Sequence, residues 1–283
     1  MTISLREGRT EDAERCGRIC YEAFRSINAE HNFPPDIPSP EVGIGLLSMM
    51  LGHPGFHVVV AERDGEIVGS NVLDERSVIA GIGPITVDPH AQNAGVGRQL
   101  MESVIARAKR FEGVRLVQAA FHNRSLSLYT KLGFDPREPL SCVQGTPLAT
   151  QLPGFTVRPA NADDLAEIDA LCHRVHDHTR SGEVADAIQS GNAQVALRAG
   201  RITGYATGIA FFSHAVGETN DDVQALIAAA PVFHGPGFLV PTRNAALLRW
   251  CLEQGLRIVQ PMTLMSMGRY EQPRGAWLAS ISY

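Results

Sequence analysis

A glycine-bearing loop between a predicted strand and a predicted helix is the part of the sequence best suited to bind an anion. It reads Gln92-Asn93-Ala94-Gly95-Val96-Gly97, and Arg98 follows directly. Free N–H groups and the positive dipole end at a helix start attract phosphate, and glycine lets the backbone come close to it. A dinucleotide fingerprint or a P-loop does not fit, because residue 100 is leucine and no Gly-Lys-Ser or Gly-Lys-Thr follows.

The segments on either side of this loop must hold it in place. Residues 78–87 read as a buried strand, and Pro84 within it predicts a bulge or a splay because proline donates no ladder hydrogen bond. From Gln99 onward apolar residues recur with helical spacing, which predicts an amphipathic helix. The segment therefore has the strand, loop and helix order that a phosphate site requires.

A second motif follows further along the chain. Residues 114–120 read as a strand, after which Asn123 precedes the run Leu128-Tyr129-Thr130-Lys131-Leu132-Gly133-Phe134. The two ordered motifs resemble those of the Gcn5-related N-acetyltransferase (GNAT) superfamily: a Gln/Arg-x-x-Gly-x-Gly/Ala loop, then an Asn and Leu-Tyr-x-x-Leu-Gly-Phe. The resemblance covers about residues 3–145.

The resemblance implies which residues bind acetyl-coenzyme A (acetyl-CoA). Loop amides would hold the pyrophosphate, the splayed strand would lend backbone groups to the pantetheine, and Asn123 would contact the pantetheine side. The implied cofactor-binding residues are Ile85, Thr86, Val87, Gln92, Asn93, Ala94, Gly95, Val96, Gly97, Arg98, Asn123 and Ser127. Tyr129 is implied as the acid that protonates the leaving thiolate, a role open to a tyrosine at the edge of an apolar slot. The alternative for Tyr129 is an aromatic side chain packed on the sheet.

The general base is not defined by either motif. Asp74 and Glu75 close the strand that precedes the first motif, and His90 and His122 flank the cofactor motifs. Each of the four is a candidate base, and each also fits a solvated loop residue. Glu75 is the preferred candidate.

The sequence repeats itself, and the second copy has lost the features that carry chemistry. Residues 5–14 resemble 157–166, and a hairpin pattern at 57–69 resembles 193–204. Where the first copy has its glycine loop, the second has Glu218, Asp221 and Asp222, which would repel a pyrophosphate. Cys251 precedes Gly255 by four residues, as Tyr129 precedes Gly133. We expect the second copy not to bind acetyl-CoA.

The predicted fold class is α/β with an α+β type of mixed sheet. It comprises two tandem GNAT-like domains, each a central mixed, mostly antiparallel sheet flanked by helices. We assign residues 1–150 to the acetyl-CoA-binding domain and 151–283 to the degenerate domain without a pyrophosphate loop. The boundary lies in a proline- and glycine-punctuated stretch, 135–154, of which 140–143 also fits a last strand of the first domain.

Composition narrows the function classes. Among 283 residues, 25 Lys and Arg against 30 Asp and Glu give a net charge of -5, which argues against nucleic acid and anionic membranes as partners. No apolar run reaches the roughly 20 residues of a spanning helix and no secretory signal is visible, so a cytoplasmic location is expected. The cysteines form no CxxC pair, and His173, His176 and His178 fit a solvated helix end. We expect no metal.

The predicted function is an acetyl-CoA-dependent N-acetyltransferase that transfers acetyl directly to a primary amine of a small molecule. The stretch from His31 to Phe56, with a helix start at Ser39-Pro40-Glu41, would line the acceptor cleft or simply cover the sheet. Its apolar content suggests an apolar or aromatic amine. The alternatives are a non-catalytic CoA-binding sensor or assembly module, and a protein or peptide N-acetyltransferase. The protein is expected as a monomer or homodimer.

Overall fold

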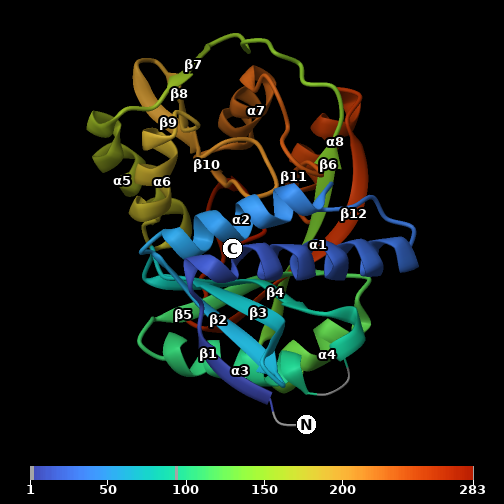
Figure 1. The fold of residues 1–283 in the computed structure, drawn as a ribbon. Helices are drawn as coiled ribbons and strands as arrows, with labels where there is room; N and C mark the ends of the chain where they lie inside the picture. Colours follow the sequence, from blue (N-terminus) through green and yellow to red (C-terminus); the bar gives the residue numbers. More distant parts are fainter. Residues whose placement is uncertain (1–2, 93–94, 283) are drawn as a thin grey trace.

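Two successive runs of strands and helices make up the chain and follow the same order (Figure 1). The computed structural model describes residues 3–92 and 95–282. The first run comprises β1 (Ile3–Glu7), the 3-10 turn η1 (Thr10–Asp12), α1 (Ala13–Glu30), α2 (Pro40–Gly52), β2 (Phe56–Arg63), β3 (Glu66–Asp74), β4 (Ile79–Val87), η2 (Pro89–Ala91), α3 (Val96–Ala108), β5 (Gly113–Ala119), α4 (Asn123–Lys131) and β6 (Asp135–Gln144). The second comprises β7 (Phe155–Pro159), η3 (Ala162–Asp164), α5 (Leu165–His176), α6 (Ser181–Gln189), β8 (Gln194–Arg198), β9 (Arg201–Ala206), β10 (Ala215–Gly217), α7 (Asn220–Ala229), β11 (Phe238–Pro241), α8 (Ala245–Glu253), β12 (Arg257–Gly268) and β13 (Ala276–Leu278).

The start of each run repeats down to its side-chain contacts. Asp12 pairs with Arg6 at 2.6 Å and accepts a hydrogen bond from the backbone N–H of Arg9. In the second run Asp164 pairs with Arg158 at 2.7 Å and accepts from the N–H of Asn161. In both cases the carboxylate caps the first helical turn and ties it to the preceding strand. The internal repeat predicted from the sequence is thereby confirmed.

The predicted hairpins also match in both runs. Asp64 and Gly65 join β2 to β3 with φ values of 55° and 84°, and Ala199 and Gly200 join β8 to β9 with 51° and 77°. Two successive left-handed residues form the kind of tight turn that suits the twist of a hairpin. Both hairpins have a register shift near the turn, at Ala61 and at Ala196.

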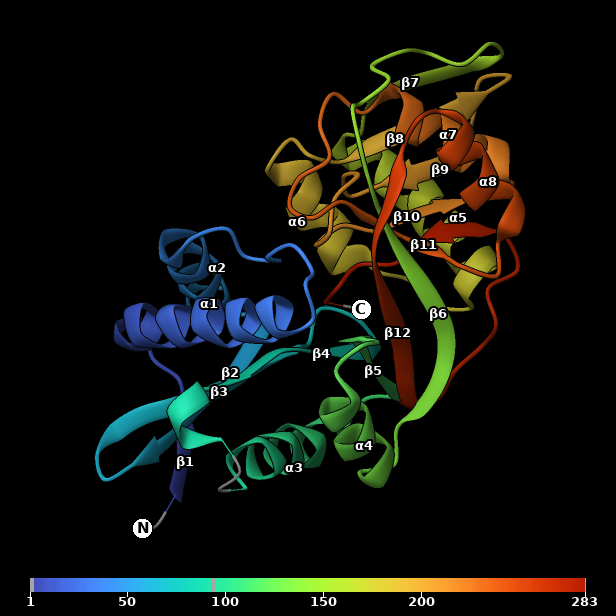
Figure 2. The same ribbon diagram turned by 90° about the vertical axis from the view of Figure 1, so that its right-hand side faces the viewer.

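The two runs exchange strands and so share one sheet. The eight-stranded sheet has the order β1-β2-β3-β4-β5-β12-β6-β11, and the five-stranded sheet has the order β13-β10-β9-β8-β7. Strand β12 of the second run lies between β5 and β6 of the first, while β6 lies between β12 and β11 of the second. Figure 2 shows β6 and β12 as two long neighbouring strands that join the halves. The mixed, mostly antiparallel sheet flanked by helices confirms the predicted fold class.

Strand exchange also explains why part of the boundary stretch is regular. Of the boundary stretch 135–154, residues 135–144 form β6, which is longer than the strand at 140–143 that the sequence suggested. Pro136 is tolerated because the pairing with β12 shifts register beside it, between Leu264 and Met265. The predicted cut near residue 150 falls between β6 and β7, although the sheet crosses it.

Polar groups that are partly buried line the contact between the halves. Arg76, which follows β3, pairs with Asp186 of α6 at 2.7 Å, and Ser77 Oγ donates to the backbone oxygen of Thr179. Behind this contact lies the buried ion pair of Arg180 and Glu183, at 2.6 Å. Ion pairs without full access to water depend on both partners, so these contacts fix how the halves meet.

Two of the three histidines expected at a solvated helix end are buried beside these groups. His176 and His178 are each 4% exposed, whereas His173 is exposed. His176 lies edge-on to Trp277, and His178 Nδ1 donates to the backbone oxygen of His176 at 2.8 Å. The solvated-end interpretation therefore holds only for His173. The burial of His176 and His178 could not be inferred from local helical spacing, because strand β13 brings Trp277 over this helix end.

Two buried histidines of the second half, His178 and His214, make the free energy of unfolding depend on pH. Burial, with Arg115 nearby, lowers the pKa of His178 to about 3, and burial, with Arg180, lowers the pKa of His214 to about 4. Below pH 6.5 the unfolded chain binds protons that the folded chain does not, so the unfolding free energy falls by about 1.4 kcal/mol per pH unit for each such histidine. We expect denaturant unfolding to show this fall between pH 6.5 and 4.5. His178→Asn is expected to reduce the slope by about one proton, while His173→Asn, at an exposed position, keeps the wild-type slope; equal slopes in all three proteins would contradict the argument.

Helices cover the sheet on the side that carries the glycine loop. In α3 the side chains of Leu100, Met101 and Val104 are fully buried, as the apolar spacing predicted, and burial of each is worth roughly 1.5–3 kcal/mol.

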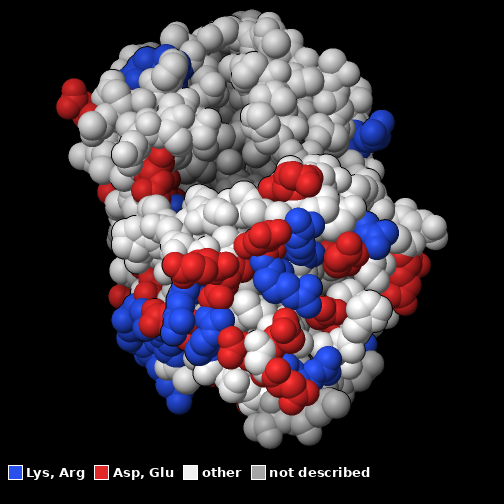
Figure 3. All heavy atoms as spheres, viewed as in Figure 1, with Lys and Arg blue, Asp and Glu red and all other residues white. Residues whose placement is uncertain are grey.

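Acidic and basic residues are intermixed on the face that carries α1, where Arg18 pairs with Glu14 (Figure 3). Within the described residues, no helix combines the length and apolarity needed to cross a bilayer.

Candidate active site

The candidate site begins where two neighbouring strands part. Strand β4 pairs in parallel with β5 only at three positions, the last joining Gly81 to Arg115. Asn71 of β3 pairs with Ile85 of β4, and Leu73 pairs with Ile82. Strand β4 therefore has one residue more than β3 between these two pairs, which makes a bulge around Pro84. The splay and bulge predicted from Pro84 are both present. They leave the edge of β4 that would face β5 open beyond Gly81, so its backbone groups can bind a ligand.

Helix α3 begins at the mouth of this opening. Gly95 precedes it as the N-cap residue with φ 80°, a left-handed conformation that favours glycine. Gly97 lies in the first turn. A Cβ added to it would lie 3.8 Å from the side chain of Val87 and 4.0 Å from that of Leu128. The first N–H groups of α3 have no intrahelical acceptor and are oriented away from the helix body. Asn93 and Ala94 lie outside the described residues.

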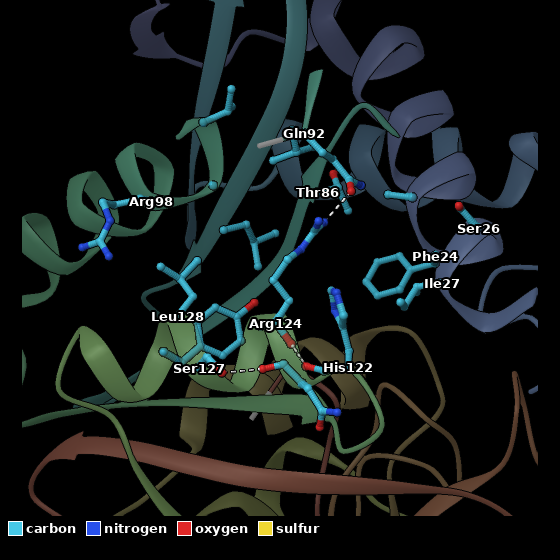
Figure 4. Close-up of a pocket in the computed structure, with 18 of the residues that line it drawn as sticks. Phe24, Ser26, Ile27, Thr86, Gln92, Arg98, His122, Arg124, Ser127 and Leu128 are labelled. Atoms are coloured by element: carbon cyan, nitrogen blue, oxygen red, sulfur yellow. Dashed lines mark hydrogen bonds between the residues drawn. The ribbon is translucent and has the colours of Figure 1, made fainter. Parts of the chain in front are cut away.

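A cavity of about 650 Å³ connects these features, and residues from both predicted motifs line it. Figure 4 shows the side chains around it, with Thr86 and Gln92 on one side and Ser127 and Leu128 of α4 on another. Of the predicted cofactor residues, those that line the cavity are Ile85, Thr86, Val87, Gln92, Gly95, Val96, Gly97, Arg98, Asn123 and Ser127. The structure thus brings together every predicted cofactor residue that it describes.

The cavity also has lining residues that the motifs did not reveal. Arg124 reaches from α4 to Gln92, with Nη2 2.5 Å from Oε1, and adds a positive charge at the cavity (Figure 4). Its position next to Asn123 within the second motif was a usable signal. Phe24 and Ile27 of α1 close the opposite side. Nothing in the local sequence of α1 distinguishes these two from ordinary core residues.

Tyr129 stands where this cavity meets a second, smaller one of about 140 Å³. The side chain is only 8% exposed and lies edge-on to Phe134, with ring centroids 6.5 Å apart. Burial raises the pKa of Tyr129, so its hydroxyl carries a proton throughout the neutral range. A protonated hydroxyl between a long cavity and a small one can act as a proton donor to a leaving group.

The preferred candidate base does not lie at either cavity. Glu75 pairs with Arg107 of α3 at 2.6 Å and with Arg110 at 2.5 Å. Burial alone would raise the pKa of Glu75, but the hydrogen bond and charge of Arg107 outweigh it and hold the pKa below its usual range. The prediction of Glu75 as general base therefore finds no support in this geometry. Its carboxylate instead ties the end of β3 to α3.

Of the other candidate bases, one lines both cavities. His122 lies at the start of α4, and burial, with the charge of Arg124, lowers its pKa. Its imidazole is therefore neutral near pH 7 and can accept a proton. Asp74 is buried against Arg76, whereas His90 is exposed and lines neither cavity.

The corresponding place in the second copy is filled by its own side chains. At the start of α7, Asp222 accepts hydrogen bonds from the backbone N–H and the hydroxyl of Thr219, at 2.8 and 2.7 Å. Glu218 pairs with Arg201 at 2.6 Å. The donors that α3 leaves for a ligand are used internally here. At the position of Tyr129, burial raises the pKa of the Cys251 thiol to about 12.

Within residues 3–92 and 95–282, no group of three or more histidine, cysteine, aspartate or glutamate side chains is arranged to hold a metal ion. All five cysteines are buried free thiols. Besides backbone amides, the large cavity is lined by Tyr129, by the two histidines His31 and His122, by Arg98, Arg124 and Lys131, and by the carboxylate of Glu30.

Comparison with known proteins bears on both halves. Residues 54–136 match the family model described as "Acetyltransferase (GNAT) domain". A solved structure from Pyrococcus horikoshii, assigned as an acetyltransferase, superimposes with a TM-score of 0.75 at 15% identity and covers 97% of this chain and 94% of that chain. A GCN5-related N-acetyltransferase from Sphaerobacter thermophilus gives 0.60 at 16%, covering 99% and 98%. A tandem GNAT protein from the clavulanic acid biosynthesis pathway, solved without acetyl-CoA, gives 0.59 at 13%, covering 94% and 98%. No curated protein matches at a significant level of sequence similarity.

The splayed strands and the glycine-led helix lie within the range that matches the GNAT acetyltransferase domain. The solved structures show that the fold of tandem GNAT proteins extends over almost the whole length of this chain.

Proposed function

We propose that the protein is an acetyl-CoA-dependent N-acetyltransferase that transfers acetyl directly to the primary amine of a small molecule. The observation that carries the proposal is the position of Tyr129, buried at the meeting point of the large and the small cavity. One cavity is lined by anion-binding groups and the other is mostly apolar. This division suits two substrates that meet at a single proton donor.

The residues of the large cavity fit acetyl-CoA. The open edge of β4 offers backbone groups at residues 85–87, and the hydroxyl Oγ1 of Thr86 is buried without a hydrogen-bond partner in the described part of the chain. The start of α3 at Gly95, with Arg98 and Arg124 nearby, supplies amides and positive charge for phosphates. When bound, acetyl-CoA supplies an activated acyl group.

The chain's own residues then have separate tasks. The backbone N–H groups on the open edge of β4 polarise the acyl oxygen. His122, neutral near pH 7, takes a proton from the amine as the new C–N bond forms. Tyr129 gives its proton to the sulfur as the C–S bond breaks, and regains one from solvent afterwards.

The test begins with cofactor binding. Acetyl-CoA at about 100 times its Kd is expected to stabilise the folded protein by roughly 2.7 kcal/mol, which is several degrees in Tm for a chain of this size. The second step measures thiol release with a panel of small amines and peptides. The absence of any Tm shift at millimolar acetyl-CoA would overturn the proposal. A shift without thiol release for any amine would instead indicate a CoA-binding sensor, and release with peptides alone a protein N-acetyltransferase.

A further inference from the structure

The smaller cavity is built by both halves of the chain. Its volume is about 140 Å³, and it shares Tyr129 and His122 with the cofactor cavity. The first half contributes Ile37 and Leu46 from the region around α2, and the second half contributes Phe211 among others. The remaining lining residues from the second half are Phe212, Met262, Ile281 and Ser282. The copy that lost its own phosphate loop thus forms one wall of the pocket beside Tyr129.

Among these mostly apolar walls lies one carboxyl group. Asp36, between α1 and α2, is 8% exposed and lines the cavity. Its Oδ1 accepts a hydrogen bond of 2.6 Å from Nε2 of Gln260, a residue of β12 that is 1% exposed. Burial raises the pKa of Asp36 because the apolar surroundings disfavour its charged form, and a bound cation would offset that desolvation cost.

A second oxygen acceptor points to the same ligand chemistry. Gln118 of β5 is 3% exposed and lines the cavity, and its Nε2 donates to the backbone oxygen of His122 at 3.0 Å and to Ser125 Oγ at 3.1 Å. These bonds fix the side chain so that Oε1 is the free end, and within the described residues Oε1 has no hydrogen-bond partner. Buried oxygens of this kind are satisfied by an N–H donor.

We infer that the acceptor is a small monoamine with a compact apolar body, an inference that rests on the proposed function. Asp36 and Gln118 recognise its nitrogen, and residues of the second copy complete the pocket. An apolar cavity of about 150 Å³ accommodates a benzene ring, so the volume suits a body of six to eight heavy atoms. Peptides and polyamines exceed this space. Asp36 binds the amine as its ammonium ion, which releases one proton to solvent before it attacks. The second proton passes to His122 as the C–N bond forms, and Tyr129 protonates the sulfur as the C–S bond breaks.

The test uses benzylamine as the probe, with the full-length protein. In the presence of coenzyme A, benzylamine is expected to raise Tm further, and in the thiol-release assay its kcat/KM is expected to exceed those of ethanolamine, spermidine and an N-terminal peptide. Asp36→Asn keeps an oxygen for Gln260 and removes the charge. It is expected to raise KM for benzylamine about 10- to 100-fold while kcat changes little. Asp64→Asn, at the exposed β2–β3 turn, is the matched control and is expected to leave KM unchanged.

The contribution of the second copy is tested by Phe211→Leu, which is expected to shift preference toward amines with a larger body. The acetyl-CoA-induced Tm shift is measured for every variant and is expected to stay at the wild-type value. Without that shift in the wild type, the proposed function itself fails. With the shift present, an unchanged KM in Asp36→Asn, no response of the wild type to benzylamine, or higher kcat/KM for the peptide or spermidine would overturn the inference about the acceptor while leaving acetyl-CoA binding in place.

Discussion

Replacing Tyr129 with phenylalanine is expected to lower kcat for thiol release by roughly 10²- to 10⁴-fold, the usual contribution of a positioned general acid. The ring, its packing on Phe134 and the cavity shape are retained, so only the hydroxyl proton is lost. Because burial raises the pKa of Tyr129, the wild-type hydroxyl is protonated across the pH range of such an assay. The measurement is steady-state kinetics with saturating acetyl-CoA, together with the Tm shift that acetyl-CoA induces, which is expected to be unchanged.

A tyrosine of the second copy provides the control. Tyr205 is buried, its hydroxyl bonds to Nε2 of His214 at 3.1 Å, and it lines neither cavity. Tyr205→Phe is expected to reduce stability by about 1 kcal/mol while leaving kcat at the wild-type value. A kcat in Tyr129→Phe equal to that of the control would assign Tyr129 a packing role only.

Replacing Gly95 with aspartate is expected to abolish the stabilisation by acetyl-CoA. The carboxylate would stand at the start of α3, where the cavity offers its amides to a phosphate. Two like charges about 5 Å apart repel by roughly 3 kcal/mol at an effective dielectric constant near 20, which weakens binding by about two orders of magnitude. Thermal unfolding with and without acetyl-CoA measures the loss.

Two control variants separate charge from backbone strain. Gly65 has φ 84° against 80° for Gly95. Among the described residues, an added Cβ meets no atom within 4 Å at Gly65 and meets the end of Gln99 at Gly95. Gly65→Asp therefore carries the same left-handed aspartate at a hairpin turn away from the cavity, and Gly95→Asn carries the same shape without charge. Both are expected to retain the acetyl-CoA shift. Loss of the shift in Gly95→Asn as well would mean that shape, and not charge, is decisive.

The cofactor side of the site could be predicted from the sequence because its determinants are local. Gly95 and Gly97 begin the helix that they mark, and Pro84 forces the splay within its own strand. Tyr129 follows Asn123 on a single short helix. In each case the residue and the geometry it creates are only a few positions apart.

The smaller cavity, where we propose that the acceptor binds, could not be predicted, because part of its lining comes together only through strand exchange. Asp36 and Gln260 are far apart in the chain and come together when β12 inserts between β5 and β6. Nothing in the periodicity of β12 indicates which sheet it joins. The prediction of Glu75 as general base is without support for a similar reason. Arg107 at the end of α3 and Arg110 just beyond it pair with its carboxylate, a contact that the sequence around Glu75 does not reveal.

The exchanged strands have a consequence for how the molecule as a whole behaves. Since residues 262–268 of β12 pair with the whole of β5, opening the second half exposes the backbone edge of β5, the strand that borders the splay beside the large cavity. The two halves are therefore not independent folding units. A substitution that lowers the free energy of unfolding of one half also favours local unfolding of the other. The second half therefore contributes to how long the large cavity of the first half stays intact.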